Sequence, residues 1–160
     1  MTAKNQTQDA VTTGLPPYDP AAVGRIAKRI QIQAVELLGA HFQHADDGPL
    51  PEASPAEAIP EVGMDVEWSL SDDASLLGCV LTFGTFFDGD GPYDLVARFR
   101  LVYTVEPGGE LDESDLEQFA NWNAVFNAWP YWREYLSSTL NRAQLPRFVA
   151  PVLPVPRPGE

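Results

Sequence analysis

The sequence predicts an α+β fold, a four-stranded antiparallel sheet with a C-terminal helical hairpin on one face. Two observations support this class. Apolar and polar residues alternate with a period of two in four segments before residue 106. Between residues 112 and 145 a 3.6-residue period takes over, and this stretch holds three of the four tryptophans. Helices and strands are thus segregated along the chain, which is typical of α+β folds.

Length and composition set limits on function. The 160 residues suffice for one domain with a sizeable core. With 23 acidic and 10 basic residues the formal net charge is -13, which disfavours binding to nucleic acid or to anionic membrane surfaces. Cys79 is the single cysteine, so no intramolecular disulfide can form. The first residues lack an apolar signal segment and no apolar run reaches membrane-spanning length, so we expect no membrane insertion and a cytoplasmic location.

The first 61 residues fall into three segments that differ in periodicity and composition. Residues 1–24 show no period and are predicted to form a flexible arm. Alternation begins at Arg25 and predicts a first strand to about Phe42, with Gly39 marking a bulge or bend. Residues 44–61 contain four prolines and five acidic residues, which indicates a long solvated loop.

Three further strands follow, and their alternation is clearer. They are predicted at residues 62–70, 76–87 and 94–105. Asp88-Gly89-Asp90-Gly91 favours a hairpin turn between the last two strands, because Asp-Gly steps readily adopt a positive φ. The segment also resembles the start of a calcium loop, but the later ligands of such a loop are missing. Arg98 and Arg100 share one face and are expected to pair with acidic neighbours across strands.

The helical stretch carries its own start and stop signals. Ser114 and Glu117 have the spacing of a capping box, which predicts where the first helix begins. Pro130 is expected to end that helix and to open the second at its first position. The second helix should stop near Gln144, since Pro146 follows.

No catalytic motif is found. The sequence lacks G-x-S-x-G, G-x-G-x-x-G and a Walker loop. His41 and His44 are the only histidines, too few for a zinc site, and Cys79 fits a buried strand position. We therefore predict no metal, no cofactor and no enzymatic activity. An enzyme or small-ligand binder using a helix–sheet cavity stays open as an alternative, and His41 is the histidine that would have to line the cavity.

The helical stretch has more aromatic residues than one helical layer can bury on a sheet. About half should belong to the core, and the remainder suggests polypeptide binding or oligomerisation. The six lie within fourteen positions: Trp122, Phe126, Trp129, Tyr131, Trp132 and Tyr135.

The proline step in this stretch resembles a known family. SecB-type export chaperones have a Phe-Pro-Tyr step running into Arg-Glu at the start of their long helix, and then a proline, an apolar stretch and Ala-Pro-Val. In this sequence Trp replaces the Phe, and Trp132 replaces a small residue. The matching positions are Trp129, Pro130, Tyr131, Arg133, Glu134, Pro146, Ala150, Pro151 and Val152, with Pro60, Glu61 and Val62 before the second strand.

The resemblance implies an ATP-independent holdase, a homotetramer that binds unfolded preproteins in an apolar groove during protein export. It covers residues 25–154 as a chaperone domain and leaves residues 155–160 as a Pro-rich tail. Client contacts are expected on the second strand and near the proline step. The predicted client-binding residues are Val62, Met64, Val66 and Trp129 from the family positions, and Trp68, Trp122 and Phe126 from the local pattern.

Two departures from the export family bear on its partners. The surface that docks to the SecA motor is acidic in that family, whereas Arg98 and Arg100 lie on the corresponding strand here. Prolines also replace its acidic, glutamine-rich tail. SecA docking is therefore in question, and a SecB-like chaperone that protects the antitoxin of a toxin–antitoxin pair is the alternative. A third reading has the aromatics consumed entirely by subunit contacts.

Overall fold

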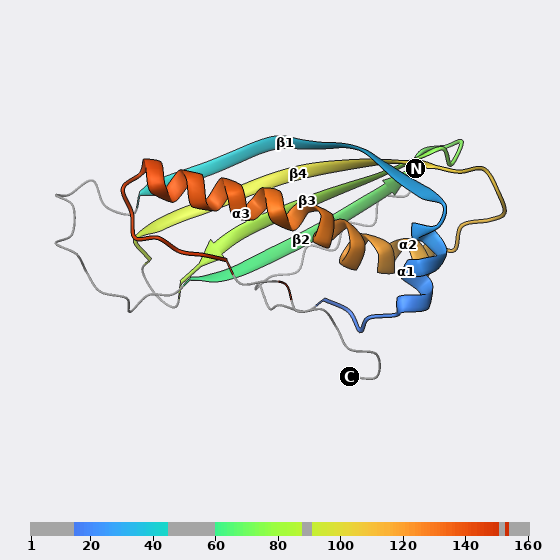
Figure 1. Cartoon of the computed structure of the whole chain (residues 1–160), viewed down its shortest axis with the longest axis horizontal. Helices are drawn as coiled ribbons and strands as arrows, with labels where there is room; N and C mark the ends of the chain where they lie inside the picture. The colour runs from blue at the N-terminus through green and yellow to red at the C-terminus, as the bar shows by residue number, and fades with distance from the viewer. Residues whose placement is uncertain (1–14, 45–59, 88–90, 151–152, 154–160) are drawn as a thin grey trace.

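The computed structural model describes residues 15–44, 60–87, 91–150 and 153, and it shows a four-stranded sheet with a long helix across one face (Figure 1). The predicted α+β class and its sheet are confirmed. In chain order the elements are α1 (Pro20–Ala27), β1 (Ile30–His44), β2 (Glu61–Leu70), β3 (Leu76–Phe86), β4 (Tyr93–Val105), α2 (Glu113–Phe119), η1 (Ala120–Ala124) and α3 (Val125–Arg142). The predicted loop at 45–59, the centre of the Asp-Gly turn and the 155–160 tail lie outside the described residues.

The sheet is antiparallel throughout, with strand order β1-β4-β3-β2, so β1 and β2 are its edges. β2 pairs with β3 in one unbroken register. β1 shifts register against β4 twice, between Ile32 and Ala34 and between Leu37 and Gly39. The second shift confirms the irregularity predicted at Gly39, and such shifts bend and twist a strand locally.

The two arginines of β4 pair across strands as predicted. Arg100 Nε donates to Glu36 Oε2 of β1 at 2.7 Å. The Arg98 guanidinium lies 4.0 Å from a carboxylate oxygen of Glu67 on β2. All four side chains are about half exposed, so each pair contributes little stability. They occupy the sheet face that the long helix leaves uncovered.

The predicted helical hairpin is wrong, because α2, η1 and α3 form one continuous helix over residues 113–142. Pro130 lies inside α3 instead of starting a second helix. An interior proline costs about 3 kcal/mol through its missing N–H and its steric clash. Ala128, Trp129 and Trp132 around it are all buried. Burying one large apolar side chain contributes about 1.5–3 kcal/mol, so packing on the sheet offsets the cost of the proline.

A row of buried residues explains the π-helical turn η1. In a regular α-helix every fourth residue rotates by about 40° from the previous one, so such a row would wind off the sheet. η1 has more residues per turn and turns the row back. Three members of this row, Ala120, Ala124 and Ala128, are alanines, whose small side chains let the helix approach the sheet closely. The row, named here the helix seam, comprises Leu116, Ala120, Ala124, Ala128, Trp132, Leu136 and Leu140.

The helix begins earlier than the capping box predicts. Asp112 is the N-cap, and its Oδ1 accepts from the backbone N–H of Ser114 at 2.8 Å and of Asp115 at 3.3 Å. Ser114 is therefore inside the helix, and the prediction of Ser114 as the cap is wrong. A carboxylate at this position also interacts favourably with the positive end of the helix dipole, which a serine hydroxyl does not.

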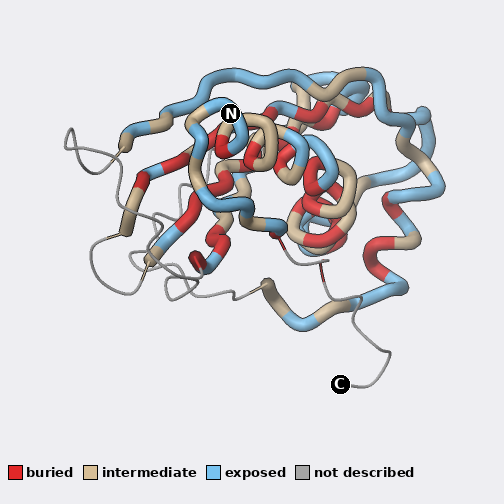
Figure 2. Tube along the Cα trace, turned by 60° about the vertical axis from the view of Figure 1, so that its left-hand side comes forward, coloured by how far each residue is buried: buried red, intermediate tan, exposed pale blue. Residues whose placement is uncertain are grey.

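The core lies where the helix meets the sheet, as the buried residues in Figure 2 show. Trp132 is fully buried and stacks on Phe83 of β3, with ring centroids 5.6 Å apart. Nearer the start of the helix, Phe119 packs edge-to-face on Tyr103 of β4, with ring centroids 5.3 Å apart. Part of the aromatic surplus is therefore ordinary core.

α1 is the element that the sequence reading missed. Asp19 caps it, Pro20 occupies its first turn, and Ala22, Val23 and Ile26 are buried. The predicted strand is thus wrong before Ile30, and the predicted flexible arm does not hold for residues 15–24. The apolar residues of a short amphipathic helix match a period of two almost as well as one of 3.6 over so few positions.

One ion pair ties α1 to α2. The Arg25 guanidinium donates two hydrogen bonds to the Asp115 carboxylate, each 2.6 Å long. Asp115 is buried, and the hydrogen bond from Arg25 lowers the pKa of its carboxyl below the usual value. Because α1 runs directly into β1, this pair fixes the start of β1 relative to the long helix.

Candidate functional site

The predicted β2 residues all lie on the helix side of the sheet. Residues directly opposite in an antiparallel pair share a face, and each of the four has a β3 partner. Phe83 is one of these partners, and its ring contacts Trp129 and Trp132 of α3 at 5.6 Å each. The pairs are Val62–Thr85, Met64–Phe83, Val66–Leu81 and Trp68–Cys79.

Burial divides these four residues. Val62 is 8% exposed and belongs to the core, whereas Met64, Val66 and Trp68 are only half-buried. We call these three residues the β2 strip. Among the described residues no strand pairs with the outer edge of β2. An edge strand presents unpaired backbone N–H and C=O groups to an extended segment, so β2 offers backbone pairing and apolar contacts together.

The three predicted helix aromatics are placed unequally. Trp129 is 6% exposed and packs edge-to-face on Phe83, so its ring serves the core. Trp122 is 8% exposed and Phe126 is half-buried, with their ring centroids 6.3 Å apart. η1, which carries Trp122, lies against β2. The Trp122–Phe126 pair therefore flanks the same side of the sheet as the β2 strip.

Trp122 also holds a segment that the sequence reading did not assign to the site. Its Nε1 donates to the backbone carbonyl of Pro16 at 3.1 Å, and its ring contacts Tyr18 at a centroid distance of 5.1 Å. Gln118 accepts from the backbone N–H of Asp19 and donates to the carbonyl of Pro17, both at 3.1 Å. The only sequence signal was Leu-Pro-Pro-Tyr itself, since nothing local indicates which helix residues it contacts.

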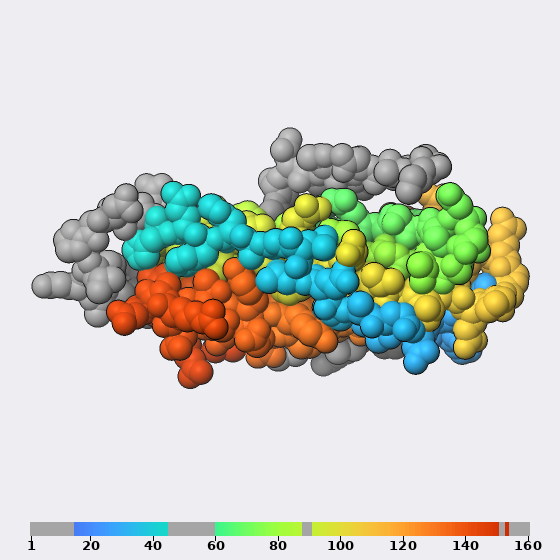
Figure 3. Space-filling view, turned by 90° about the horizontal axis from the view of Figure 1, so that it is seen from above, coloured from blue at the N-terminus to red at the C-terminus, as the bar shows by residue number. Residues whose placement is uncertain are grey.

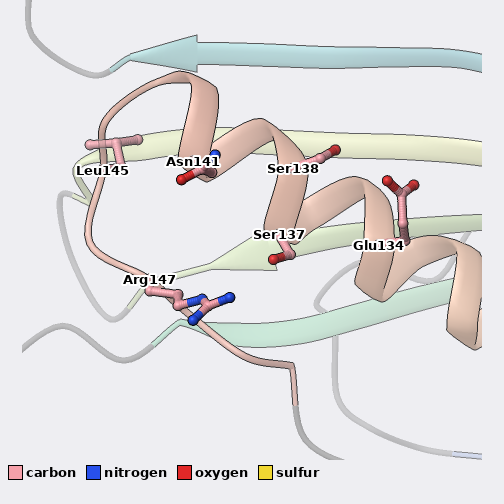
Figure 4. Close-up of a pocket in the computed structure, with 6 residues that line it drawn as sticks. All are labelled: Glu134, Ser137, Ser138, Asn141, Leu145 and Arg147. Carbon is pink, nitrogen blue, oxygen red and sulfur yellow. The ribbon is translucent and has the colours of Figure 1, made fainter.

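Two open pockets lie on α3 where the chain doubles back after the helix. One, of about 520 Å³, is formed by Glu134, Ser137, Ser138 and Asn141 of α3 with Leu145 and Arg147 (Figure 4). The other, of about 410 Å³, lies between residues 129–137 and residues 147–150. Neither lies in the helix–sheet interface, which large buried side chains fill. In the segment after α3, Phe148 packs on the core, whereas Val149 is 62% exposed.

The histidine and the cysteine considered for a catalytic site do not lie together in a cavity between helix and sheet. His41 is exposed and pairs with Val96 on the outer face of the sheet, so it does not line the helix–sheet interior. Cys79 is fully buried, and burial raises the pKa of its thiol to about 12, as expected for a structural cysteine. No group of three His, Cys, Asp or Glu that could hold a metal occurs among the described residues.

Comparison with known proteins identifies the fold. No family model matches the sequence, and no curated protein matches it significantly. Among solved structures, the SecB-like chaperone Rv1957 of Mycobacterium tuberculosis, in complex with a ChAD peptide from the Rv1956 HigA1 antitoxin, matches with a TM-score of 0.71 at 18% identity, over 83% of this chain and 97% of that chain. A Streptococcus agalactiae protein of unknown function matches with a TM-score of 0.48 at 9% identity, over 77% and 97%.

The first of these matches shows that the chain has a SecB-like fold, and the resemblance read from the residues around Pro130 is confirmed at that level. The shared architecture is the four-stranded antiparallel sheet with a single long C-terminal helix. None of the described helices is long and apolar enough to cross a membrane.

Proposed function

We propose that this protein is a chaperone that holds extended, non-native polypeptide on the β2 strip without using ATP. The observation that carries the proposal is an edge strand with an unbroken register, of which three helix-side residues are apolar and only half-buried, within a SecB-like fold. An extended client would pair with the outer edge of β2 and place alternate side chains on Met64, Val66 and Trp68. Phe126 adds an aromatic surface beside them.

Such a site binds by many shallow contacts. Each Å² of apolar surface removed from water contributes about 25 cal/mol, so a client covering several side chains gains useful affinity without a strict sequence. Backbone pairing along β2 is also independent of client sequence. The outward residues Asp65 and Glu67 are exposed, which keeps the other face of the strand solvated.

For the client we propose a segment of an antitoxin, in preference to exported preproteins in general. The M. tuberculosis structure contains a peptide from an antitoxin. In addition, Arg98 and Arg100 lie near Glu67 and Glu36 on the open face of the sheet, so that face is not uniformly acidic. A direct test uses peptides tiled across any antitoxin that the neighbouring genes encode. One tight segment supports a dedicated client, whereas weak binding of many unrelated peptides supports export.

We also propose that β1 mediates self-association into the homotetramer that the resemblance implies. Ile32, Leu37 and Leu38 are large apolar residues of β1 with exposures of 44%, 51% and 44%. Figure 3 shows β1 at the surface along one side of the molecule. A second copy that covers this edge would bury these residues and pair the strand backbone.

The experiment that tests the chaperone proposal compares two aspartate substitutions on one strand. Val66→Asp places a charge in the β2 strip, and Ser69→Asp places the same charge on the exposed outer face. The probe is reduced, carboxymethylated α-lactalbumin, a permanently unfolded protein, with binding measured by fluorescence anisotropy. We expect Val66→Asp to weaken binding at least about tenfold, because a charge must then be desolvated, and Ser69→Asp to leave it unchanged. Equal binding by all three folded proteins would refute the β2 site.

A further inference from the structure

An extended piece of this chain is already seated on the long helix. Residues 15–19 belong to no helix or strand and lie at the α2 end of the helix, just before α1 (Figure 1). Gln118 and Trp122, four residues apart and so on one face of the helix, hold it by three hydrogen bonds of 3.1 Å, all to its backbone. Gln118 and Trp122 therefore recognise backbone atoms of the segment.

The contacts select a particular kind of segment. Pro16 and Pro17 favour extended conformations and have no backbone N–H. A site that binds them therefore needs only hydrogen-bond donors, for their carbonyl oxygens. Trp122 Nε1 and Gln118 Nε2 supply those donors. Tyr18 then places its ring edge-to-face on Trp122 at 5.1 Å. Aromatic grooves that bind proline-rich peptides work by the same combination of a preformed extended backbone and an aromatic wall.

We infer that Gln118 and Trp122 form a recognition site for an extended proline–aromatic segment, that residues 15–18 occupy it in cis, and that client segments of the same chemistry bind by displacing them. The inference rests on the proposed chaperone function and names the client chemistry at one end of its site. Continuity supports it, because Trp122 contacts Phe126 and η1 lies against β2.

The segment is held in a way that permits exchange. Leu15 and Tyr18 are half-buried, and both hydrogen bonds to Gln118 are exposed. α1 is anchored separately by its buried residues and by Arg25 and Asp115, so release of residues 15–18 leaves it in place. A segment tethered this closely competes at an effective concentration in the millimolar range, which weakens the apparent affinity of a free peptide.

The test uses a fluorescein-labelled peptide, Leu-Pro-Pro-Tyr-Asp-Pro, which copies residues 15–20, and full-length protein. Tyr18→Ala removes the aromatic contact in cis and leaves the site intact, so the peptide should bind roughly five- to tenfold more tightly than to the wild type. Gln118→Ala alters the site itself and should weaken peptide binding to Tyr18→Ala protein when the two changes are combined. Tyr131→Ala, at an exposed tyrosine elsewhere on the helix, is the matched control and should bind as the wild type does.

The outcomes separate this inference from the chaperone proposal. Reduced, carboxymethylated α-lactalbumin is measured with the same proteins. If it binds wild type and Tyr18→Ala while the peptide binds both equally, the segment is only structural and the inference is overturned, with the chaperone proposal intact. If the unfolded protein binds neither, the chaperone proposal fails and the inference fails with it. Should Tyr18→Ala unfold, Leu15→Ala removes the other apolar anchor and gives the same comparison.

Discussion

The two edges of the sheet differ in ways that suit them to different partners. β1 changes register twice and exposes large apolar residues, whereas β2 keeps one register and alternates half-buried apolar residues with exposed acidic or polar ones. Large exposed apolar residues along one edge are typical of a surface that a further copy covers in an assembly. A regular edge accepts any extended chain. This difference is the reason why we propose self-association through β1 and client binding on β2.

The largest effect is expected from placing negative charge on β1. The double change Ile32→Asp and Leu37→Asp places two carboxylates where the assembly would bury apolar residues, so we expect the assembly to dissociate into smaller species. Light scattering coupled to size-exclusion chromatography measures this against the 17.6 kDa of one chain. His41→Asp, an exposed β1 residue on the other face of the sheet, is the control. A mass that does not change in the double variant would exclude β1 as the contact.

On β2 we expect the corresponding change to weaken client binding and to leave the mass of the assembly unchanged. Trp68→Ala removes the largest side chain of the β2 strip. Loss of such an aromatic anchor typically costs about 2 kcal/mol, so unfolded-protein binding should weaken roughly tenfold or more while the mass stays the same. Anisotropy titration and light scattering on one sample test both statements. A drop in mass would show that the two edges are not independent.

Cys79 reports whether β2 stays on the sheet. Its fully buried thiol, with a pKa near 12, lies directly opposite Trp68. We expect labelling by a thiol reagent at pH 8 to be slow in the folded protein and to become a few-fold faster in Trp68→Ala, because the edge opens more often. Labelling in denaturant gives the reference rate. Rapid labelling of the wild type would mean that the β2 edge is not fixed.

The smallest effect concerns the anchoring of β1 through α1. The folded-state pKa of Asp115 is lowered, mainly by the hydrogen bond from Arg25, so its contribution to stability is present above the unfolded pKa of about 3.9 and is lost as pH falls through the folded value. Thermal unfolding between pH 6 and pH 2 should show a steeper loss below about pH 4 in the wild type than in Asp115→Asn. Parallel curves would remove Asp115 from the acid response.

The sequence predicted those parts of the fold whose periodicity is long and regular. The three strands after residue 60 follow from period-two alternation, and the pairing of Arg98 and Arg100 follows from shared faces. α1 escaped because eight residues fit two periods, although Asp19-Pro20 was an available start signal. The helix was wrongly predicted to break at Pro130, because the destabilising effect of an interior proline is visible in the sequence. The burial of Trp132, which offsets it, depends on tertiary packing.

In the candidate site, too, the sequence predicts local features and does not predict features that depend on tertiary packing. That Val62, Met64, Val66 and Trp68 share a face is a local property and could be predicted. That Val62 is buried while the other three are only half-buried depends on tertiary packing, which the alternation along β2 does not encode. The contact of Gln118 with Pro17 joins residues 101 positions apart, which no local pattern encodes.

The helix seam has a consequence for how such a protein can be diversified. Ala120, Ala124 and Ala128 set the spacing between helix and sheet and are fully buried, so larger residues there would push the two layers apart. The β2 strip lies outside that seam. Under the proposed function, substitutions at Met64, Val66 and Trp68 would therefore change client preference, with the close packing of the helix seam left unaltered.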